Sequence, residues 1–359
     1  MINFIDFVIG LSYGDESKGA VIYELAKKPE YDIVMRVNGG GNAGHTIYHE
    51  GKKFVTHIIP TGIFHGKTCI IGSECVINVQ KFFDEIQMLK DAGIDTHNKI
   101  FISRECHVVT PEHIGEEFAE SKIGTTKQGI GPCIRDKYAR KGIRAEQVKE
   151  LSSYVIDLYD YFYCGRNESL GILCEGAQGH FLDISQGDYP FVTSSHCTVA
   201  GALLNSLPWN KIRKVYGVTK AYDTYVGARQ FEPDEQQFKD LRLLGNEFGA
   251  TTGRPRQCNW LNLSRLVKAM EINCVTHLIV SKVDVLKKLN ELNDNLFWCV
   301  NQGLNNALPI YLNSEEEWKN YIQTQLNRYS DAYYQAHEKY DSESDIVWRY
   351  SPTDKVEHE

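Results

Sequence analysis

The sequence predicts an α/β fold with a large, mainly parallel central sheet that is flanked by helices and carries inserted subdomains. Short β-rich runs alternate with helical patterns along most of the chain, which is typical of parallel sheets with crossover helices. Glycine-rich polar loops follow several of these strands, and such sheets bind ligands at the carboxyl ends of strands. Hydrophobic residues make up 42% of the chain, which is enough for a sizeable core.

The first strand is expected at 4–10, an apolar run that ends at a glycine. A polar loop separates it from a helix at 19–28, in which apolar residues recur on one face. The acidic and aromatic segment 314–345 is interpreted as an amphipathic surface helix packed by Trp318 and neighbouring apolar residues. Further strands are expected at 32–37, 68–71, 99–102, 171–174, 214–216 and 277–280, and further helices at 79–92, 146–163 and 263–272.

Composition limits the classes of function. The 359 residues allow two or three domains or one large α/β domain, and the absence of a repeat or linker favours one domain over 1–359. The net charge of −8, from 39 Lys+Arg and 47 Asp+Glu, argues against a nucleic-acid coat and predicts no nucleic-acid partner. Ten cysteines without a C-x-x-C pair are typical of free thiols in a reducing cytoplasm. Without a signal peptide or an apolar run of ~20 residues, a cytoplasmic protein with no membrane partner is expected.

The loop at 10–19 combines a strand end, glycines, Lys18 and a helix start. Backbone N–H groups, the helix dipole and an ammonium together predict an anion site there, although an ordinary strand-to-helix turn is the alternative. The loop is not a Walker A motif, because Ser17 stands where that pattern has glycine. This disfavours a P-loop kinase or GTPase. Asp15 and Glu16 would face a phosphate only if they hold Mg²⁺ or accept a proton.

Two further loops carry polar groups suited to a phosphorylated ligand. The loop at 38–46 has three consecutive glycines, which allow close backbone approach, and it ends near His45. That histidine can act as a general acid or stabilise charge on a phosphoryl oxygen, although a structural histidine is the more common case. The loop at 123–132 precedes a basic cluster that includes Arg140, which suits a phosphate monoester; a basic surface helix is an equal alternative.

Three more loops offer groups that recognise a base or a dicarboxylate. Gln178 follows a strand and presents a paired donor and acceptor, as needed to read a base edge. Arg254 and Arg256 stand beside hydroxyl residues and can hold a dicarboxylate by bidentate pairs. Lys282 and Asp284 follow the strand predicted nearest the C-terminus. They would place a carboxylate at a purine N–H edge with the lysine stem on the ring.

In this order, the loops resemble those of the adenylosuccinate synthetase family, whose members join aspartate to a 6-oxopurine nucleotide with a nucleoside triphosphate and Mg²⁺. The resemblance implies a ligase that forms a C–N bond on a P-loop-NTPase-like sheet. Agreement across so many separated loops is too extensive for chance. The matching segments are 14–16, 42–46, 123–126, 129–132, 175–179, 192–195 and 245–254.

The resemblance implies a role for each matching residue. Asp15 would take the proton from purine N1 and bind Mg²⁺ together with Gly44, His45 would support phosphoryl transfer onto O6, and Lys18 would hold phosphates. The nucleotide substrate would be bound by Ser17, Asn42, Thr126, Gln178, Thr193 and Arg140, the last reaching across a homodimer from the second subunit. Aspartate would be held by Thr251, Thr252, Arg254 and Arg256, and the triphosphate donor by Gly14, Glu16, Lys18, Gly19, Thr46, Lys282 and Asp284.

Departures from the family pattern bear on the substrate. The chain is short for the family, with reduced segments around 150–170 and after 290. In ordinary members the segment that corresponds to 351–355 contacts the guanine of the donor, and its sequence differs here. A compact chain with this altered segment resembles the phage branch of the family, which acts on dGMP in making diaminopurine DNA. The other replaced positions are Ser17 for a glycine, Gln128 for an arginine and Gly41 for a histidine.

Guanine and hypoxanthine share the N1–H/O6 lactam, so one chemistry serves both bases. We therefore expect a ligase that joins L-aspartate to C6 of dGMP with ATP or dATP, giving 2-amino-2′-deoxy-N6-succinyl-AMP, ADP and phosphate. Ser17 either accepts a hydrogen bond from the 2-amino group or is a neutral replacement. One alternative is an ordinary synthetase that uses IMP and GTP. Another is a catalytically silent nucleotide-binding homologue, which the retention of Asp15, Lys18, His45 and Arg254 disfavours.

Overall fold

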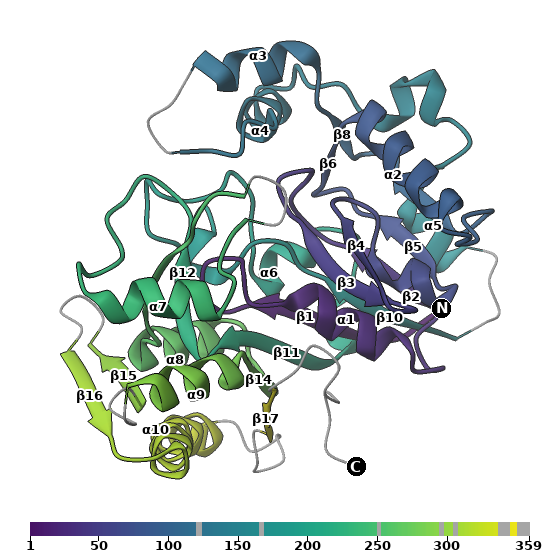
Figure 1. Cartoon of the computed structure of the whole chain (residues 1–359). Helices are drawn as coiled ribbons and strands as arrows, with labels where there is room; N and C mark the ends of the chain where they lie inside the picture. Colours follow the sequence, from purple (N-terminus) through teal and green to yellow (C-terminus); the bar gives the residue numbers. More distant parts are fainter. Residues whose placement is uncertain are drawn as a thin grey trace.

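The computed structural model describes residues 1–119, 124–164, 169–249, 253–293, 298–303, 308–336 and 345–349. At its centre lies a sheet in which nine described strands all pair in parallel, which confirms the predicted fold class (Figure 1). The strand order is β17 (Asp345–Trp348), β14 (His277–Ser281), β11 (Ile212–Lys220), β1 (Ile2–Gly10), β10 (Leu170–Glu175), β2 (Ile33–Arg36), β5 (Thr68–Ile71), β7 (Ile100–Ser103) and β9 (Val155–Ile156).

Helices cover both faces of this sheet, because the side chains of β1 alternate between two cores. Phe7 and Ile9 join the larger core with the helices at 158–163, 199–202 and 263–272, whereas Val8 joins a second core with the helix at 18–26. The helices are α1 (Lys18–Ala26), α2 (Val79–Asp91), α3 (Pro111–Ala119), α4 (Ile130–Tyr138), α5 (Leu158–Tyr163), α6 (Val199–Ala202), α7 (Gln236–Leu244), α8 (Leu263–Ile272), α9 (Val283–Leu292) and α10 (Glu315–Ala336).

Smaller paired strands are inserted between the elements of the main sheet. Three antiparallel pairs are β3 (His45–His49) with β4 (Lys52–Thr56), β12 (Tyr222–Tyr225) with β13 (Gln257–Trp260), and β15 (Trp298–Gln302) with β16 (Leu308–Leu312). A parallel pair joins β6 (Val76–Ile77) to β8 (His107–Val108). Figure 1 shows α3 and α4 (blue) above the sheet, at the top of the view, and β12 with α7 (green) at the left.

The predicted helix at 146–163 is wrong. In its place are two short 3-10 turns (Ala145–Gln147 and Lys149–Leu151), the edge strand β9 and the short helix α5. The helix begins late because the side chain of Asp157 caps it by accepting from the N–H groups of Tyr159 and Asp160. The two β-branched residues before this cap pair with β7 instead.

The helix expected at 314–345 is confirmed as α10 over Glu315–Ala336, with Trp318 fully buried in its packing face. Asp345 begins β17 instead, and 337–344 lie outside the described residues. All ten cysteines lie in the described part of the chain as free thiols, and eight of them are buried. In that same part of the chain, none of the helices combines the length and the apolar character that crossing a bilayer requires.

Candidate active site

The loops singled out in the sequence meet at one edge of the sheet. The loops after β1, β2, β10 and β14 leave the carboxyl ends of strands that lie within one five-strand stretch of the sheet. The hydroxyl of Ser281, the last residue of β14, donates to the backbone oxygen of Glu16 in the loop after β1 (3.1 Å), which ties that loop to the end of β14. Parallel strands bring their carboxyl ends to the same edge, so this grouping follows from the topology.

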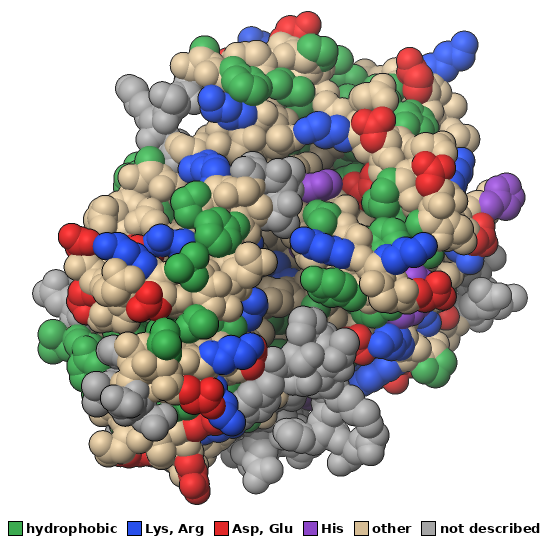
Figure 2. Space-filling view, viewed as in Figure 1, with side chains coloured by type: hydrophobic (Ala, Val, Ile, Leu, Met, Phe, Trp, Pro, Cys, Tyr) green, Lys and Arg blue, Asp and Glu red, His purple; other side chains and the backbone are tan. Residues whose placement is uncertain are grey.

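Two cavities open at this edge and share a wall. The first lies between the part carrying α3 and α4 and the part carrying β12, and Figure 2 shows the surface hollowed there. The second lies against α1, the β3–β4 hairpin and the start of α9. The residues that line both cavities are Gly14, Asp15, Gly44, His45 and Arg256.

The loop at 10–19, after β1, is stabilised by a buried ion pair between two of its own residues. Lys18 Nζ lies 2.6 Å from Glu16 Oε2, and both side chains are 2% exposed. Glu16 Oε1 accepts the backbone N–H groups of Ser12 (3.1 Å) and Gly14 (2.7 Å), and Lys18 Nζ also donates to the Gly14 carbonyl (3.0 Å). Glu16 was expected at the triphosphate donor, but it lines neither cavity because these donors occupy its carboxylate.

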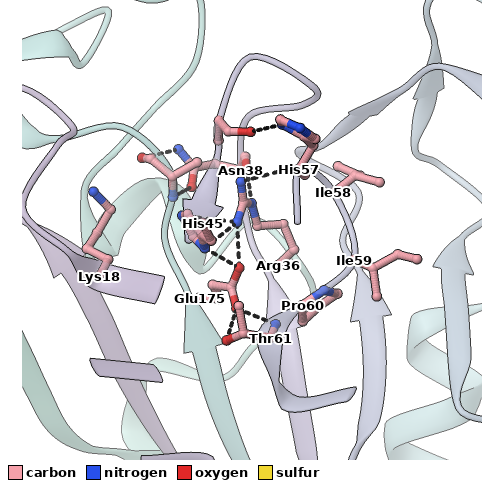
Figure 3. Close-up of polar contacts among 12 residues, drawn as sticks. Lys18, Arg36, Asn38, His45, His57, Ile58, Ile59, Pro60, Thr61 and Glu175 are labelled. Atoms are coloured by element: carbon pink, nitrogen blue, oxygen red, sulfur yellow. Dashed lines mark hydrogen bonds and ion pairs between the residues drawn. The ribbon is translucent and has the colours of Figure 1, made fainter. Parts of the chain in front are cut away.

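His45 lies in a buried network with Arg36 and Glu175 (Figure 3). Glu175 Oε1 is 2.6 Å from His45 Nδ1 and 2.6 Å from Arg36 Nη1. Its other oxygen accepts from the backbone N–H (2.9 Å) and hydroxyl (3.1 Å) of Thr61. The Glu175 carboxylate is fully buried, so the imidazole is held in one orientation by a charge that water does not screen.

The electrostatics of this network set the charge of His45. Burial and the neighbouring Arg36 lower the pKa of His45 to about 4, against the attraction of Glu175. Burial raises the pKa of Glu175, but His45, Arg36 and the Thr61 N–H outweigh it and lower this pKa to about 2. The imidazole is therefore neutral at pH 7 and donates its Nδ1–H to an ionised carboxylate. The negative charge of a phosphoryl group beside it would raise its pKa and favour proton uptake.

A second network holds Asp15 at the shared wall. Arg256 donates from Nη2 to Asp15 Oδ1 (2.8 Å) and from Nη1 to Glu247 Oε2 (2.6 Å). Glu247 also pairs with Lys220 Nζ (2.9 Å) and accepts from the Tyr222 hydroxyl (2.6 Å). Burial raises the pKa of Glu247, but Lys220 and Arg256 outweigh it and lower this pKa to about 2. Arg256, expected at aspartate, thus holds the carboxylate of Asp15.

The first cavity is lined by polar groups from loops far apart in the sequence. The side-chain oxygen of Gln178 is buried there and has no hydrogen-bond partner among the described residues. Arg254 lines the same cavity and donates to the carbonyl of Gly124 (3.0 Å). A buried acceptor without a donor is costly, so the Gln178 oxygen indicates a ligand that donates to it. The other predicted nucleotide-binding residues in this cavity are Asn42, Thr126 and Thr193.

The second cavity is rich in cations, which suits a triphosphate. Lys282 is the N-cap residue that precedes α9 and has a left-handed φ of 65°, and its Nζ donates to the Gly245 carbonyl (2.9 Å). Burial lowers the pKa of Lys282. Ser17, expected near the base of the nucleotide substrate, lines this second cavity and not the first. The cationic side chains of the lining are Lys18, Lys53, Lys220, Arg256, Lys282 and Arg349, and Gly14, Gly19, Thr46 and Asp284 also lie there.

Some predicted site residues are not placed in either cavity. Arg140 follows α4, is exposed and lines neither cavity, so its reach into a partner subunit stays a prediction. Thr251 and Thr252, and the altered segment 351–355, lie outside the described residues.

Sequence reasoning gave no role to Arg36, Glu175, Lys220 or Glu247, all of which are buried. Arg36, Glu175 and Lys220 are the residues at which β2, β10 and β11 end, after largely apolar runs. Charged residues are rarely buried unless they are paired, so a charged residue directly after an apolar strand indicates a buried ion pair. This pattern could have identified these residues in the sequence.

Comparisons with known proteins agree with this geometry. A family model described as adenylosuccinate synthetase matches residues 7–150 and 145–337. The adenylosuccinate synthetase of Chlorobium limicola is 38% identical, covering 79% of this chain and 77% of its own, and that of Helicobacter acinonychis is 38% identical, covering 80% of each.

Two solved structures share the fold. The fully ligated adenylosuccinate synthetase of Plasmodium falciparum aligns with a TM-score of 0.76 at 26% identity over 99% of each chain. The succinoaminodeoxyadenylate synthetase of cyanophage S-2L, bound to dGMP and to dATP as an energy donor, aligns with a TM-score of 0.69. That alignment covers 92% of this chain and 100% of the phage chain at 22% identity, which establishes a common fold.

Proposed function

This chain belongs to the adenylosuccinate synthetase family of C–N ligases, which join aspartate to a purine nucleotide, and we propose that its reaction runs at the wall between the two cavities. The observation that carries the proposal is that Asp15, His45 and Arg256 line both cavities. A nucleotide in the first cavity and a triphosphate in the second would then meet across these side chains.

The proposed reaction has two steps. Asp15 accepts the proton from purine N1, so that O6 gains electron density and attacks the γ-phosphorus while the nucleoside diphosphate leaves. The amine of aspartate then attacks C6, the C6–O6 bond breaks, and inorganic phosphate leaves as the amine loses a proton. Oxygen at C6 is a poor leaving group until it is phosphorylated, which is why the triphosphate is needed. Phosphoryl transfer itself depends mainly on positioning and on stabilisation of charge.

Residue roles follow from the two linings. In the first cavity the Gln178 oxygen would accept a hydrogen bond from the purine, and Asn42, Thr126 and Thr193 would bind the rest of the nucleotide. Arg254 in the same cavity would hold the aspartate carboxylates, and the family resemblance assigns Thr251 and Thr252 to the same ligand. In the second cavity the donor would be bound by Gly14, Lys18, Gly19, Thr46, Lys282 and Asp284.

Adenylosuccinate synthetases depend on Mg²⁺ as a family, and the residues at the shared wall fit such an ion. Among the described residues there is no cluster of three or more His, Cys, Asp or Glu side chains that could hold a metal by themselves. Mg²⁺ typically takes one or two carboxylates together with substrate phosphates. Asp15, whose side chain is 29% exposed, and the backbone of Gly44 would supply the protein ligands. The ion would neutralise charge on the transferred phosphoryl group.

For the base we propose dGMP, with ATP or dATP as the donor. The support is the fold shared with the cyanophage S-2L synthetase, which is bound to dGMP and dATP, together with the reduced segments around 150–170 and after 290. The altered segment 351–355 also favours a donor other than GTP. Ser17 lines the donor cavity and not the first cavity, so we assign it to the donor rather than to the 2-amino group of the base.

The test is aspartate-dependent release of phosphate by purified protein with Mg²⁺, comparing dGMP with IMP and ATP or dATP with GTP. We expect turnover with dGMP and an adenine donor. Turnover with IMP alone would show an ordinary synthetase. No aspartate-dependent phosphate from any pair, with nucleotide still bound, would show a silent homologue, and Asp15→Asn serves as the inactive control.

Members of the family typically function as dimers, and we propose that Arg140 completes the first cavity of a partner subunit. Its exposed position after α4 supports this assignment. We expect Arg140→Ala and Asp15→Asn subunits each to be inactive alone. When equal amounts are mixed, half of the dimers should contain one subunit of each kind, and one of their two sites is then complete. The mixture should therefore regain about one quarter of the wild-type activity. No recovery after verified exchange of subunits would refute the shared site.

A further inference from the structure

A buried carboxylate outside both cavities holds the segment on which the His45 network depends. Glu85 lies on α2, is 6% exposed and lines neither cavity. Its Oε1 accepts from the backbone N–H groups of His57 (3.1 Å) and Ile59 (3.0 Å). Its Oε2 accepts from those of His57 (3.1 Å) and Ile58 (3.2 Å). One side chain therefore satisfies three consecutive backbone donors.

The segment 57–61 that Glu85 holds reaches the His45 network by three routes (Figure 3). The carbonyl of His57 accepts from Arg36 Nη2 (3.2 Å), and its ring Nδ1 lies 2.8 Å from the carbonyl of Ala43 in the glycine-rich loop. At the other end, Thr61 donates twice to Glu175, which orients His45. The segment also directly follows Thr56, which pairs with His45 across the β3–β4 hairpin.

We propose that Glu85 is a positioning residue for the phosphoryl-transfer step, which acts by fixing segment 57–61 and through it the orientation of His45. This inference rests on the proposed function. The physical reason is that the N–H groups of residues 57–59 are held by a single side chain at both of its oxygens. Without that acceptor these three N–H groups lose their partner, and the segment is no longer fixed in the geometry in which it contacts Glu175, Arg36 and Ala43. Small displacements at a reacting group lower the rate more than they lower binding.

Two variants of Glu85 remove its acceptors to different extents. Glu85→Gln keeps the shape and one acceptor oxygen, but its amide N–H₂ faces at least one backbone donor, whereas Glu85→Ala removes both acceptors. We expect kcat per folded site to fall by about tenfold or more in Glu85→Ala and by less in Glu85→Gln. KM for aspartate and for the triphosphate should change by less than about threefold, because neither ligand would contact Glu85.

Matched controls separate positioning from general loosening of the fold. Leu89→Ala, one turn along α2 in the same hydrophobic core, should lower the melting temperature without changing kcat per folded site. Asp84→Asn removes a neighbouring but exposed charge and should change neither quantity. If Glu85→Gln and Glu85→Ala lose thermal stability as Leu89→Ala does, but keep wild-type kcat, Glu85 is merely structural and the proposal is overturned.

A readout that does not depend on activity comes from NMR of histidine-labelled protein. In Glu85→Gln the ring resonances of His45 and His57 should shift, whereas those of the exposed His97 should stay in place. In Leu89→Ala the ring resonances of His45, His57 and His97 should all stay in place. Unchanged His45 resonances in Glu85→Gln would overturn the inference. If the wild-type protein shows no ligase turnover, the proposed function fails on its own, and the resonances still test the link from Glu85 to His45.

Discussion

Replacing Glu175 by glutamine tests whether the buried network orients His45. In the wild-type protein one carboxylate oxygen accepts from Arg36 and His45 while the other accepts twice from Thr61. An amide has one acceptor oxygen, so its N–H₂ must face one of these two sets of donors. The Arg36 guanidinium, which is only 1% exposed, also loses its ionised partner and has little access to water in its place.

The expected cost follows from that burial. Breaking a fully buried ion pair on one side destabilises a protein by about 3–5 kcal/mol, because the remaining charge stays unpaired in a medium of low dielectric constant. Both side chains are essentially inaccessible, so the full penalty applies here. The imidazole also loses its orienting acceptor, and we expect kcat to fall by about 100-fold or more, as when a general acid or base is lost.

Urea-induced unfolding measures the first quantity, and aspartate-dependent phosphate release under saturating substrates measures the second. Asp84→Asn is the control, since an exposed carboxylate should change the free energy of unfolding by less than about 0.5 kcal/mol. If Glu175→Gln stayed within 1 kcal/mol of wild type and within threefold of its kcat, the network would not carry the role assigned to it.

Three further results are expected. Burial lowers the pKa of His45 to about 4, so as the pH drops from about 6.5 to 4 this histidine takes up a proton in the unfolded chain but not in the folded one, and the free energy of unfolding should fall. In His45→Gln, unfolding titrations should show a smaller dependence of this free energy on pH. Burial raises the pKa of Glu85 to about 7, although the backbone N–H groups of residues 57–59 and the charge of Arg36 oppose this rise. Protonation of Glu85 below about pH 7 should therefore lower kcat. If Glu85→Gln showed the same loss of kcat on acidification, the assignment would be refuted. Ser17→Gly should change KM for the triphosphate and leave the ratio of kcat/KM for dGMP and IMP within about twofold, since Ser17 lines the donor cavity; an altered base preference in steady-state kinetics would contradict that placement.

Apolar periodicity was sufficient for the main frame of the fold. The helix predicted at 263–272 is α8 with the same bounds, and seven of the sheet strands were expected within a few residues of where they lie. The failure at 146–163 has a local cause and a distant one. The Asp157 cap starts α5 late, and β9 forms only because β7 offers it an edge. The expectation of one domain over 1–359 stays a prediction.

The sequence by itself determined that glycine-rich loops leave the carboxyl ends of parallel strands, and hence that their residues meet at one edge. That conclusion needs only local patterns and the geometry of parallel sheets. Which way each side chain points depends on partners that are distant in the chain. Arg256 reaches Asp15 across 241 positions, and Glu175 reaches Arg36 across 139.

Only the tertiary structure decided that Glu16 turns inward, that Ser17 lies in the donor cavity, and that Glu85 braces the segment behind His45. Buried charges and backbone donors must find partners, and packing alone decides which partners come within reach. Local sequence therefore indicates where the chemistry is, whereas the long-range pairing of charges decides how each group can act.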